Sequence, residues 1–247
     1  MTAEYNNKVA IVTGGGRGFG QAFGAALAER GADVYLLDRD GEAAAEAAAT
    51  IGAGARAMEA DVTDEQQIKN LFSRVADDHG GIDILVNNAG LHSHEYSRPL
   101  ADMGLEKIRR LFDVNVMGTV NCTLAAAPCM AKRETPSIVN IASAAAFSGG
   151  GYGTSKLAVI GLTMTFAREL AVDGVRVNAI APGVILTDTI REEMAADTLA
   201  RIKAMQYLGS DGEEQDIVDA MLFLTSASAK FITGETLRVT GGFAAGV

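Results

Sequence analysis

The sequence is poor in cysteine, in proline and in positive charge. Its 247 residues include two cysteines, four prolines and 21 Lys and Arg side chains against 31 Asp and Glu, for a net charge of −10. Binding to a polyanion requires a basic patch, and the sequence has no dense Lys/Arg cluster, so we expect no nucleic-acid partner. Cys122 and Cys129 do not form a C-x-x-C pair, and we expect both to be reduced packing residues.

Long apolar runs are also missing. No uninterrupted apolar stretch is long enough to cross a bilayer, and the first residues show no charged segment followed by an apolar one. We therefore expect a cytoplasmic protein with no membrane partner. No repeat or Pro/Ser linker divides the chain, so its length predicts one well-buried α/β domain over residues 1–247.

Seven short runs of β type recur along the chain, with helix-patterned stretches between most of them. The runs are Val9–Val12, Asp33–Leu37, Ala55–Glu59, Ile82–Val86, Ser137–Ile141, Val175–Ile180 and Thr236–Val239. This alternation predicts a doubly wound, mostly parallel sheet with helices on both faces and ligands beyond the carboxyl ends of its strands. The polar, methionine-dotted stretch at about 183–212 breaks the strand pattern and predicts a helical lid.

A cluster of glycines follows the first run. Residues 9–20 read VAIVTGGGRGFG, and the stretch from Phe19 to Arg30 has apolar residues at helical spacing. The glycines therefore lie at a strand-to-helix turn, where bare backbone and the positive end of a helix dipole can receive a pyrophosphate. The pattern is Thr13-Gly14-x-x-x-Gly18-x-Gly20, which matches neither the strict G-x-G-x-x-G nor the Walker motif, so a plain loop remains an alternative.

An acidic residue ends the second run. A dinucleotide site requires such a residue about 20 positions after the glycines, and Asp38 follows Gly20 by 18. Its carboxylate can accept hydrogen bonds from the adenosine ribose and repels a 2′-phosphate, which predicts NAD(H). Arg17 and Arg39 leave NADP open, because two guanidinium groups near the ribose could instead hold that phosphate.

A tyrosine and a lysine share a helix face farther along. Tyr152 and Lys156 lie at positions i and i+4 of a helix-patterned run that continues to Leu170. A nearby ammonium and a cationic nicotinamide favour phenolate, so Tyr152 could exchange a proton with a substrate oxygen, and oxidation should rise with pH. Ser143 could donate a hydrogen bond to the same oxygen, and Asn115 could relay a proton or anchor the lysine.

Together these motifs resemble the single-domain short-chain dehydrogenase/reductase family over nearly the whole chain. They are T-G-x-x-x-G-x-G, Asp38, Asp61, the sequence NNAG from Asn87, Asn115, Ser143, Y-x-x-x-K and Pro182-Gly183. The resemblance implies a Rossmann-type fold, a nicotinamide cofactor and a catalytic set of Asn115, Ser143, Tyr152 and Lys156. It also suggests a homotetramer, or else a dimer, with the Tyr152–Leu170 helix and the C-terminal strand as interfaces.

The predicted cofactor site draws on the glycine turn, the strand ends and this resemblance. Its residues are Gly14, Arg17, Gly18, Phe19, Gly20, Asp38, Arg39, Asp61, Val62, Asn88, Ala89, Gly90, Tyr152, Lys156, Pro182, Gly183, Val184 and Thr187. The resemblance implies that Lys156 contacts the nicotinamide ribose and that Asp61 and Val62 border adenine. It also implies that the carboxamide is flanked by Pro182, Val184 and Thr187.

One segment departs from the family pattern. Tyr152 follows Ser143 by only nine positions, through AAAFSGGG, whereas most relatives have a clearly longer segment. Three glycines could let the shortened chain still place Ser143, and Ser148 is the substitute hydroxyl.

The sequence His92-Ser93-His94-Glu95 raises the possibility of a metal site. It has no third clustered ligand, and alternate side chains on an extended segment point apart, so we expect no metal and a polar pocket rim instead.

The leading functional hypothesis is a dehydrogenase that moves hydride between NAD(H) and a secondary alcohol/ketone pair, with a small or medium hydrophobic alcohol as substrate. One alternative is a catalytically silent NAD-binding scaffold or redox sensor, which the shortened segment favours. Another is an NADP-dependent ketoreductase, for example of the 3-oxoacyl type.

Overall fold

The computed structural model describes residues 4–92, 96, 98–131, 133–185 and 196–243. Its seven strands form one sheet in the order β3-β2-β1-β4-β5-β6-β7, and every neighbouring pair is parallel. The strands are β1 (Val9–Thr13), β2 (Asp33–Asp38), β3 (Ala55–Glu59), β4 (Ile84–Asn87), β5 (Ser137–Ile141), β6 (Arg176–Pro182) and β7 (Thr236–Val239). The predicted doubly wound sheet is confirmed.

Helices connect the strands. The α-helices are α1 (Gly18–Glu29), α2 (Gly41–Ile51), α3 (Glu65–His79), α4 (Leu100–Met103), α5 (Leu105–Phe112), α6 (Gly118–Met130), α7 (Gly150–Glu169), α9 (Ala196–Ala204) and α10 (Glu214–Thr225). A π-helical turn, η1 (Asp113–Met117), joins α5 to α6, and the 3-10 turns are η2 (Ala144–Phe147), η3 (Leu170–Asp173) and η4 (Ala227–Ala229). Within the described ranges, no helix combines the length and apolarity needed to cross a bilayer.

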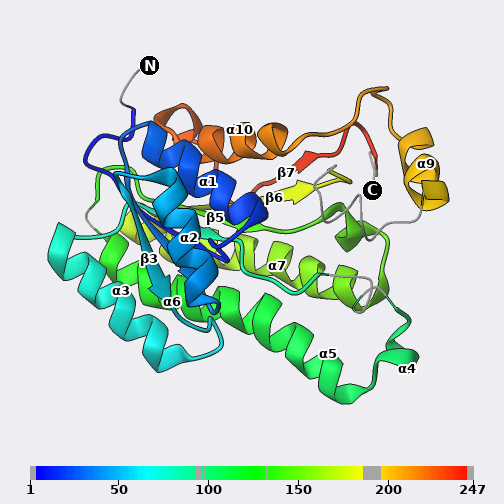
Figure 1. The fold of residues 1–247 in the computed structure, drawn as a ribbon, viewed down its shortest axis with the longest axis horizontal. Coiled ribbons are helices and arrows are strands. Elements are labelled where there is room, and N and C mark those ends of the chain that lie inside the picture. The colour runs from blue at the N-terminus through cyan, green and yellow to red at the C-terminus, as the bar shows by residue number, and fades with distance from the viewer. Residues whose placement is uncertain (1–3, 93–95, 97, 132, 186–195, 244–247) are drawn as a thin grey trace.

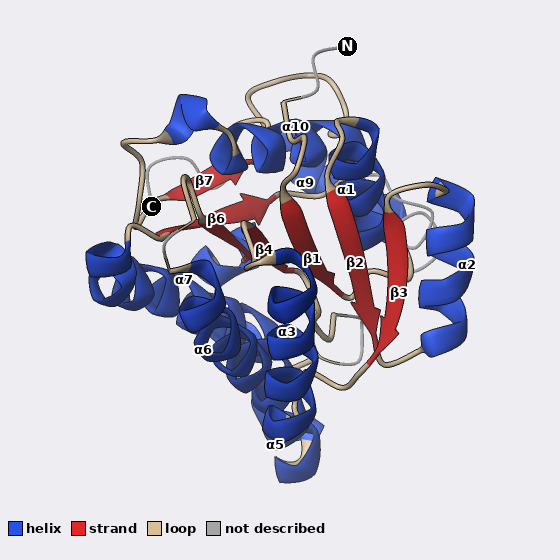
Figure 2. Ribbon diagram, turned by 90° about the vertical axis from the view of Figure 1, so that its left-hand side faces the viewer, coloured by secondary structure: helices blue, strands red, loops and turns tan. Residues whose placement is uncertain are grey.

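The helices cover both faces of the sheet. Figure 1 shows α1 and α10 on one side, with α3, α6 and α7 on the other, and Figure 2 shows the twist of the strands between them. Two apolar clusters fill the two interfaces, and β1 contributes to both. Ala10 and Val12 pack toward α1 and α10, whereas Val9 and Ile11 pack toward α3 and α6. This alternation explains why a strand buried on both faces reads as a continuous apolar run.

Four strands extend farther at their carboxyl ends than their apolar patterns predict. β1 continues to Thr13, β2 to Asp38, β4 to Asn87 and β6 to Pro182. Backbone pairing does not require an apolar side chain, so the polar residues Thr13, Asp38 and Asn87 do not show in a hydrophobicity pattern. All four strand ends lie at the carboxyl edge of the sheet, where doubly wound folds bind ligands.

The chain reverses its direction of travel across the sheet at β1. β2 lies on one side of β1 and β4 on the other. The loops that leave the carboxyl ends of β1 and β4 therefore diverge to opposite faces and leave a crevice between them. The glycine cluster follows β1 and the NNAG sequence begins at the last residue of β4, so both predicted cofactor motifs flank this crevice.

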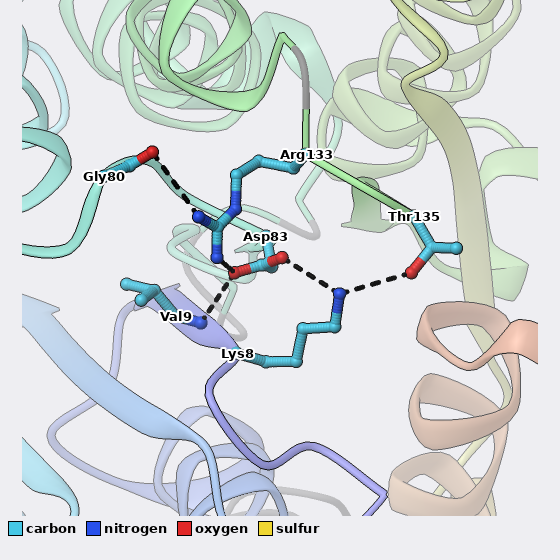
Figure 3. A network of polar contacts seen from close by, with 6 residues as sticks. All are labelled: Lys8, Val9, Gly80, Asp83, Arg133 and Thr135. Atoms are coloured by element: carbon cyan, nitrogen blue, oxygen red, sulfur yellow. Dashed lines mark hydrogen bonds and ion pairs between the residues drawn. The ribbon is translucent and has the colours of Figure 1, made fainter.

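An ionic network closes the opposite edge of the sheet (Figure 3). Asp83, which is 1% exposed, accepts hydrogen bonds from the backbone of Val9 (3.0 Å), from Lys8 Nζ (3.1 Å) and from Arg133. Burial by itself would raise the pKa of Asp83, but the bonds from Arg133, Val9 and Lys8 outweigh it and hold the pKa below its usual value. The network ties the start of β1 to β4 and to the loop before β5.

Replacing Asp83 with Asn should lower the free energy of unfolding by about 3 kcal/mol, because two partly buried cations lose their counter-charge. The folded pKa is depressed, so this contribution is present above the unfolded pKa of 3.8 and disappears as pH falls through the folded value. Urea unfolding at neutral and acidic pH measures both effects. Asp77→Asn, at an exposed position of α3, serves as the control, and an equal loss in both variants would contradict the prediction.

Candidate active site

Tight backbone contacts shape the glycine turn after β1. Gly14 has φ +62°, and a Cβ there would lie 2.9 Å from the Ala89 Cα. A Cβ on Gly20 would lie 1.9 Å from the Gly14 carbonyl oxygen. Gly18 has φ +51°, and a Cβ there would lie within 4 Å of no other atom. The backbone at Gly18 is therefore open on its outer side and is not packed against a neighbour. Gly14 and Gly20 thus close the turn, and Gly18 keeps its outer side bare.

The turn leads into an uncapped helix. α1 begins at Gly18, its N-cap residue Arg17 makes no capping hydrogen bond through its side chain, and its first turn has no acidic residue. The N–H groups there and the positive end of the helix dipole suit an anion. The bare backbone at Gly18 and this uncapped terminus fit the pyrophosphate of a dinucleotide. Phe19 is half-buried and stacks on Phe23 at 6.1 Å between ring centres, which fixes the first turn against the core.

Asp38 lies beside the glycine turn. Its carboxylate accepts hydrogen bonds from the backbone N–H groups of Gly16 and Asp40, each at 3.1 Å. These contacts hold the negative charge at the end of β2, next to the residues suited to the pyrophosphate. Arg17 and Arg39, which are neighbours in sequence of Gly16 and Asp38, are both exposed.

The predicted adenine border follows β3. The Asp61 carboxylate accepts hydrogen bonds from the backbone (2.9 Å) and hydroxyl (2.8 Å) of Thr63, which forms a tight turn. Val62 is buried, and its carbonyl accepts a hydrogen bond from Asn121 Nδ2 at 3.0 Å. The structure thus places both residues at the carboxyl edge of the sheet, beside the start of α6.

The NNAG residues hold the glycine turn in place. Asn88 Nδ2 donates hydrogen bonds to the carbonyls of Thr13 and Gly14, both at 3.0 Å. The Thr13 hydroxyl accepts from the backbone N–H groups of Asn88 and Ala89, also at 3.0 Å, and donates to the carbonyl of Val86. Thr13 therefore joins β1 to β4 at the crevice. We did not predict it as a site residue, although its place at the head of the glycine motif was visible.

Three of the predicted catalytic side chains meet at the start of α7. The Ser143 hydroxyl lies close enough to the Tyr152 phenol to lower its pKa. Lys156 Nζ lies 5.9 Å from the centre of the Tyr152 ring and donates to the carbonyl of Ile141 at 2.7 Å. The i, i+4 spacing on α7 and the turn after β5 bring these groups together, as the sequence predicts.

Asn115 lies on the other side of Lys156. It is 1% exposed in the π-helical turn η1, a local distortion that often marks a functional site. Its amide accepts from the Leu91 backbone N–H (2.7 Å) and donates to the Leu91 carbonyl (3.1 Å) and to the Ser155 hydroxyl (3.0 Å). A Cβ on Gly90 would lie 3.3 Å from both Asn115 Oδ1 and Lys156 Nζ. The side chain thus anchors the loop after β4 beside the lysine, and sequence reasoning missed its partners Leu91 and Ser155.

The shortened segment still brings Ser143 to the phenol. Gly149 and Gly150 have φ +83° and +82°, which lets the chain reverse between η2 and α7. Ser148 is exposed, and its hydroxyl donates to the Ala145 carbonyl at 3.2 Å. The structure therefore places Ser143, and not Ser148, at Tyr152.

The pKa values of the pair correct one expectation. Burial raises the pKa of the Tyr152 phenol, and the hydrogen bond with Ser143 lowers it only in part. Burial also lowers the pKa of Lys156 from 10.5 to about 8. In the protein alone, the ammonium therefore does not shift Tyr152 toward phenolate as we predicted, because desolvation of the phenol dominates. Tyr152 is therefore a neutral phenol at neutral pH.

Replacing Lys156 with Met should stabilise the protein although it damages the site. The shift of the lysine pKa to about 8 corresponds to a cost of about 3 kcal/mol for the buried ammonium. Loss of the hydrogen bond to Ile141 offsets about 1 kcal/mol, so the free energy of unfolding at neutral pH should rise by about 2 kcal/mol.

The same variant has a defined pH dependence. Because the folded pKa lies below the unfolded value, the cost of the ammonium is complete below about pH 8 and disappears as pH rises toward 10.5. The advantage of Lys156→Met in urea unfolding should shrink over that range. Lys69→Met, at an exposed position of α3, is the matched control, and a gain in Lys69→Met equal to that in Lys156→Met would contradict the explanation.

The remaining predicted residues lie near the end of β6. Pro182 is the last residue of the strand, and the Gly183 N–H donates to the Val239 carbonyl at 2.8 Å. A Cβ on Gly183 would lie 2.9 Å from the Thr240 Cα, and Val184 follows half-buried. Thr187 lies outside the described residues.

The predicted lid and the histidine-rich sequence are described only in part. Helix α9 falls within the range predicted for a lid, and His92 is exposed, whereas His94 and Glu95 lie outside the described residues. Among the residues that are described, no three His, Cys, Asp or Glu side chains group as metal ligands would.

Known proteins match this chain over most of its length. Residues 14–244 match the family described as Enoyl-(Acyl carrier protein) reductase. The chain is 34% identical to the 3-oxoacyl-(acyl-carrier-protein) reductase FabG of Staphylococcus aureus strain Mu50, over 95% of this chain and 97% of that one. It is 38% identical to a 3alpha-hydroxysteroid dehydrogenase of Mediterraneibacter gnavus, over 98% of both chains.

A solved structure extends the agreement to the fold. The structure is described as a short-chain alcohol dehydrogenase from Sinorhizobium meliloti 1021, and it is 34% identical with a TM-score of 0.89 over 100% of both chains. This chain therefore belongs to the short-chain dehydrogenase/reductase family, and it is an oxidoreductase with that family's Rossmann-type fold.

Proposed function

We propose that this protein transfers a hydride between NAD(H) and a secondary alcohol/ketone pair, with Tyr152 as the general acid and base. The observation that carries the proposal is the contact of the Tyr152 phenol with the Ser143 hydroxyl, with Lys156 Nζ 5.9 Å from the phenol ring. The group lies next to the crevice between β1 and β4, where the glycine turn and the uncapped end of α1 fit a dinucleotide.

Each side chain has a distinct task. A bound nicotinamide supplies or accepts the hydride. Tyr152, whose pKa burial keeps high, gives its proton to the ketone oxygen in reduction and takes it back in oxidation. Ser143 donates a hydrogen bond to the same oxygen and orients it. Lys156, held by Ile141, places a positive charge beside the phenol and stabilises the phenolate that forms when the proton leaves.

Asp38 supports NAD rather than NADP. Both carboxylate oxygens are held at the end of β2 by backbone N–H groups, so the negative charge stays at the place where the adenosine ribose would lie. A 2′-phosphate there would meet this fixed charge. The alternative is an NADP-dependent ketoreductase of the 3-oxoacyl type, in which Arg17 and Arg39 would turn toward the phosphate.

The substrate proposal rests on the chemistry that the relatives' names share. A 3-oxoacyl group carries a ketone, and its reduction gives a secondary alcohol. A 3alpha-hydroxysteroid carries a secondary alcohol, and its oxidation gives a ketone. The assembled Ser143 and Tyr152 suit that oxygen in either direction. The contact of Ser143 with Tyr152 also removes the main argument for a silent scaffold, which was the shortened segment.

Exposed apolar side chains support a homotetramer. On α7, Leu157 and Met164 are about half exposed, and Gly161 lies between them in a helix interior where a Cβ would meet no atom within 4 Å. A glycine in a helix interior destabilises the helix, and no neighbouring atom of this chain requires the missing side chain. Close approach of a helix from a second subunit would explain it. Phe231, which is 99% exposed, and Leu237 of β7 are further exposed apolar side chains. Sedimentation as a monomer would contradict this assembly.

An absorbance assay tests the proposed reaction. Purified protein is mixed with NAD or NADP and a panel of cyclic, aryl and β-hydroxyacyl secondary alcohols, and the reduced nicotinamide is followed; the matching ketones are tested with NADH and NADPH. We expect turnover with the NAD pair. Turnover with the NADP pair alone would select the alternative cofactor, whereas tight NAD binding without turnover on any substrate would support the scaffold.

A further inference from the structure

One large side chain lies between Ser143 and Tyr152. The intervening residues AAAFSGGG contain alanine, serine and glycine apart from Phe147. Alanine and glycine bury little surface, so they contribute little to holding a loop against its neighbours. Phe147 is therefore the residue of this segment that can anchor it by burial.

Phe147 sits in a small apolar cluster under the turn. It is the last residue of η2, and it packs on buried side chains from β6, from α7 and from the residue that follows β5. These are Ala142, Val159, Ala179 and Ala181, with half-buried Ile160 beside them. Three of the four buried neighbours are alanines, which leave room for one aromatic ring between the sheet and α7.

A guanidinium group lies over the same ring. Arg238 of β7 has its Cζ 4.1 Å from the centre of the Phe147 ring, within the range of a cation–π contact. The register pairs Arg238 with Ala181, one of the alanines beneath the ring. The ring is thus held between this apolar cluster and a cation from the last strand.

The short turn transmits the position of Phe147 to Ser143. η2 is four residues long, and Ser143 is its N-cap. The Ser143 carbonyl accepts from Ala146 N (3.0 Å), and its hydroxyl accepts from Ala145 N (3.2 Å). A Cβ on Gly153 would lie 2.4 Å from the Ala145 carbonyl oxygen, so the turn rests directly on α7 one residue past Tyr152.

We propose that Phe147, clamped by Arg238, is a positioning residue that holds Ser143 against the Tyr152 phenol. In this chain the aromatic anchor takes over the task of the longer segment. Neither side chain touches the reacting atoms, so both act through Ser143. The proposal deepens the proposed function, on which its kinetic readout rests, and a spectroscopic readout is independent of turnover.

The spectroscopic test follows the Tyr152 phenol directly. The protein is labelled with 3-fluorotyrosine, which lowers phenol pKa values into an accessible range, and the resonance missing from Tyr152→Phe identifies Tyr152 among the five tyrosines. Because the bond with Ser143 lowers the Tyr152 pKa, Ser143→Ala should raise it. Phe147→Ala should raise it in the same direction and add nothing in the Ser143→Ala background. Phe147→Tyr, which keeps the ring, should restore the parent titration.

The kinetic test uses the same variants. Misplacing one contact to the reacting oxygen should lower kcat for ketone reduction by about 100-fold in Phe147→Ala, with an unchanged Kd for NADH. Arg238→Met should give a smaller loss, because the apolar cluster still holds the ring. Ser148→Ala, which removes the exposed hydroxyl of the same segment, is the matched control and should keep the parent kcat.

The outcomes separate the two proposals. An unshifted Tyr152 titration in Phe147→Ala would overturn the positioning role whatever the turnover. A further shift in Ser143→Ala/Phe147→Ala beyond that of Ser143→Ala would also overturn it, because Phe147 would then act by another route. A shifted titration in a parent protein that reduces no ketone would leave the positioning role standing and refute the reaction. Phe147→Leu, which keeps an apolar anchor, covers the case in which Phe147→Ala fails to fold.

Discussion

Replacing Tyr152 with Phe is expected to lower kcat for both reduction and oxidation by about 1000-fold, because the hydroxyl is the group that exchanges a proton with the substrate oxygen. The ring stays, so its packing beside Lys156 and on the small cluster of Tyr96, Met103 and Leu111 is kept. Binding of NADH, measured by calorimetry, should change by less than about threefold, which corresponds to under 1 kcal/mol. A loss confined to kcat separates proton transfer from cofactor binding.

The control for this variant is Tyr207→Phe. Tyr207 is 78% exposed, so removal of its hydroxyl should leave kcat and cofactor binding unchanged. Full activity in Tyr152→Phe would show that another group supplies the proton. An equal loss in both variants would point to a general effect of the substitutions rather than to the site.

Replacing Asp38 with Ser is expected to change the cofactor preference. The carboxylate can accept hydrogen bonds from the ribose, and a bond to a charged group contributes about 2 kcal/mol, so NAD should bind about 30-fold more weakly. Removal of the negative charge should strengthen NADP binding about tenfold, because Arg17 and Arg39 then face the 2′-phosphate without a competing carboxylate. Calorimetric Kd values for both cofactors measure the exchange.

Asp33→Ser supplies the matched control. Asp33 begins the same strand that Asp38 ends, and it forms an ion pair with Arg56 at 2.7 Å. Loss of that carboxylate should leave both cofactor affinities unchanged. If Asp38→Ser bound the two cofactors as the parent protein does, Asp38 would not be the selector, and the arginines would carry the discrimination.

Local patterns were sufficient to predict the fold and the shared helix face of Tyr152 and Lys156. The apolar run of β1, the glycines after it and the helical spacing of α1 are all contained within residues 9–30. The i, i+4 spacing of Tyr152 and Lys156 predicts a shared face because both lie on one helix. Each of these inferences depends on residues that are close in sequence.

Contacts between distant segments could not be predicted in the same way. Asp83 forms ion pairs with Lys8, which is 75 positions away in sequence, and with Arg133, which is 50 positions away. Arg238 of the last strand lies over the ring of Phe147. The π-helical turn that carries Asn115 also leaves no hydrophobic signature. Such features depend on which strands become neighbours, and the sequence pattern does not determine side-chain partners across a sheet.

Burial acts against the expected shift of the Tyr152 pKa when no cofactor is bound. Spacing predicts that the ammonium of Lys156 lies near Tyr152, but it says nothing about how much water surrounds the phenol. In the structure desolvation raises the pKa of Tyr152 and lowers that of Lys156 to about 8. A neutral phenol suits proton donation to a ketone, so the protein alone is prepared for reduction.

Isotope transfer tests the central claim most directly. NADH that carries deuterium at its transferable C4 position is mixed with the protein and a ketone that it reduces, and the alcohol is analysed by mass spectrometry. Direct transfer predicts one deuterium on the carbinol carbon of the product, and Tyr152→Phe should form about 1000-fold less of it. An alcohol without deuterium, or equal labelling by the variant at the parent rate, would contradict hydride transfer at this site with Tyr152 as the proton donor.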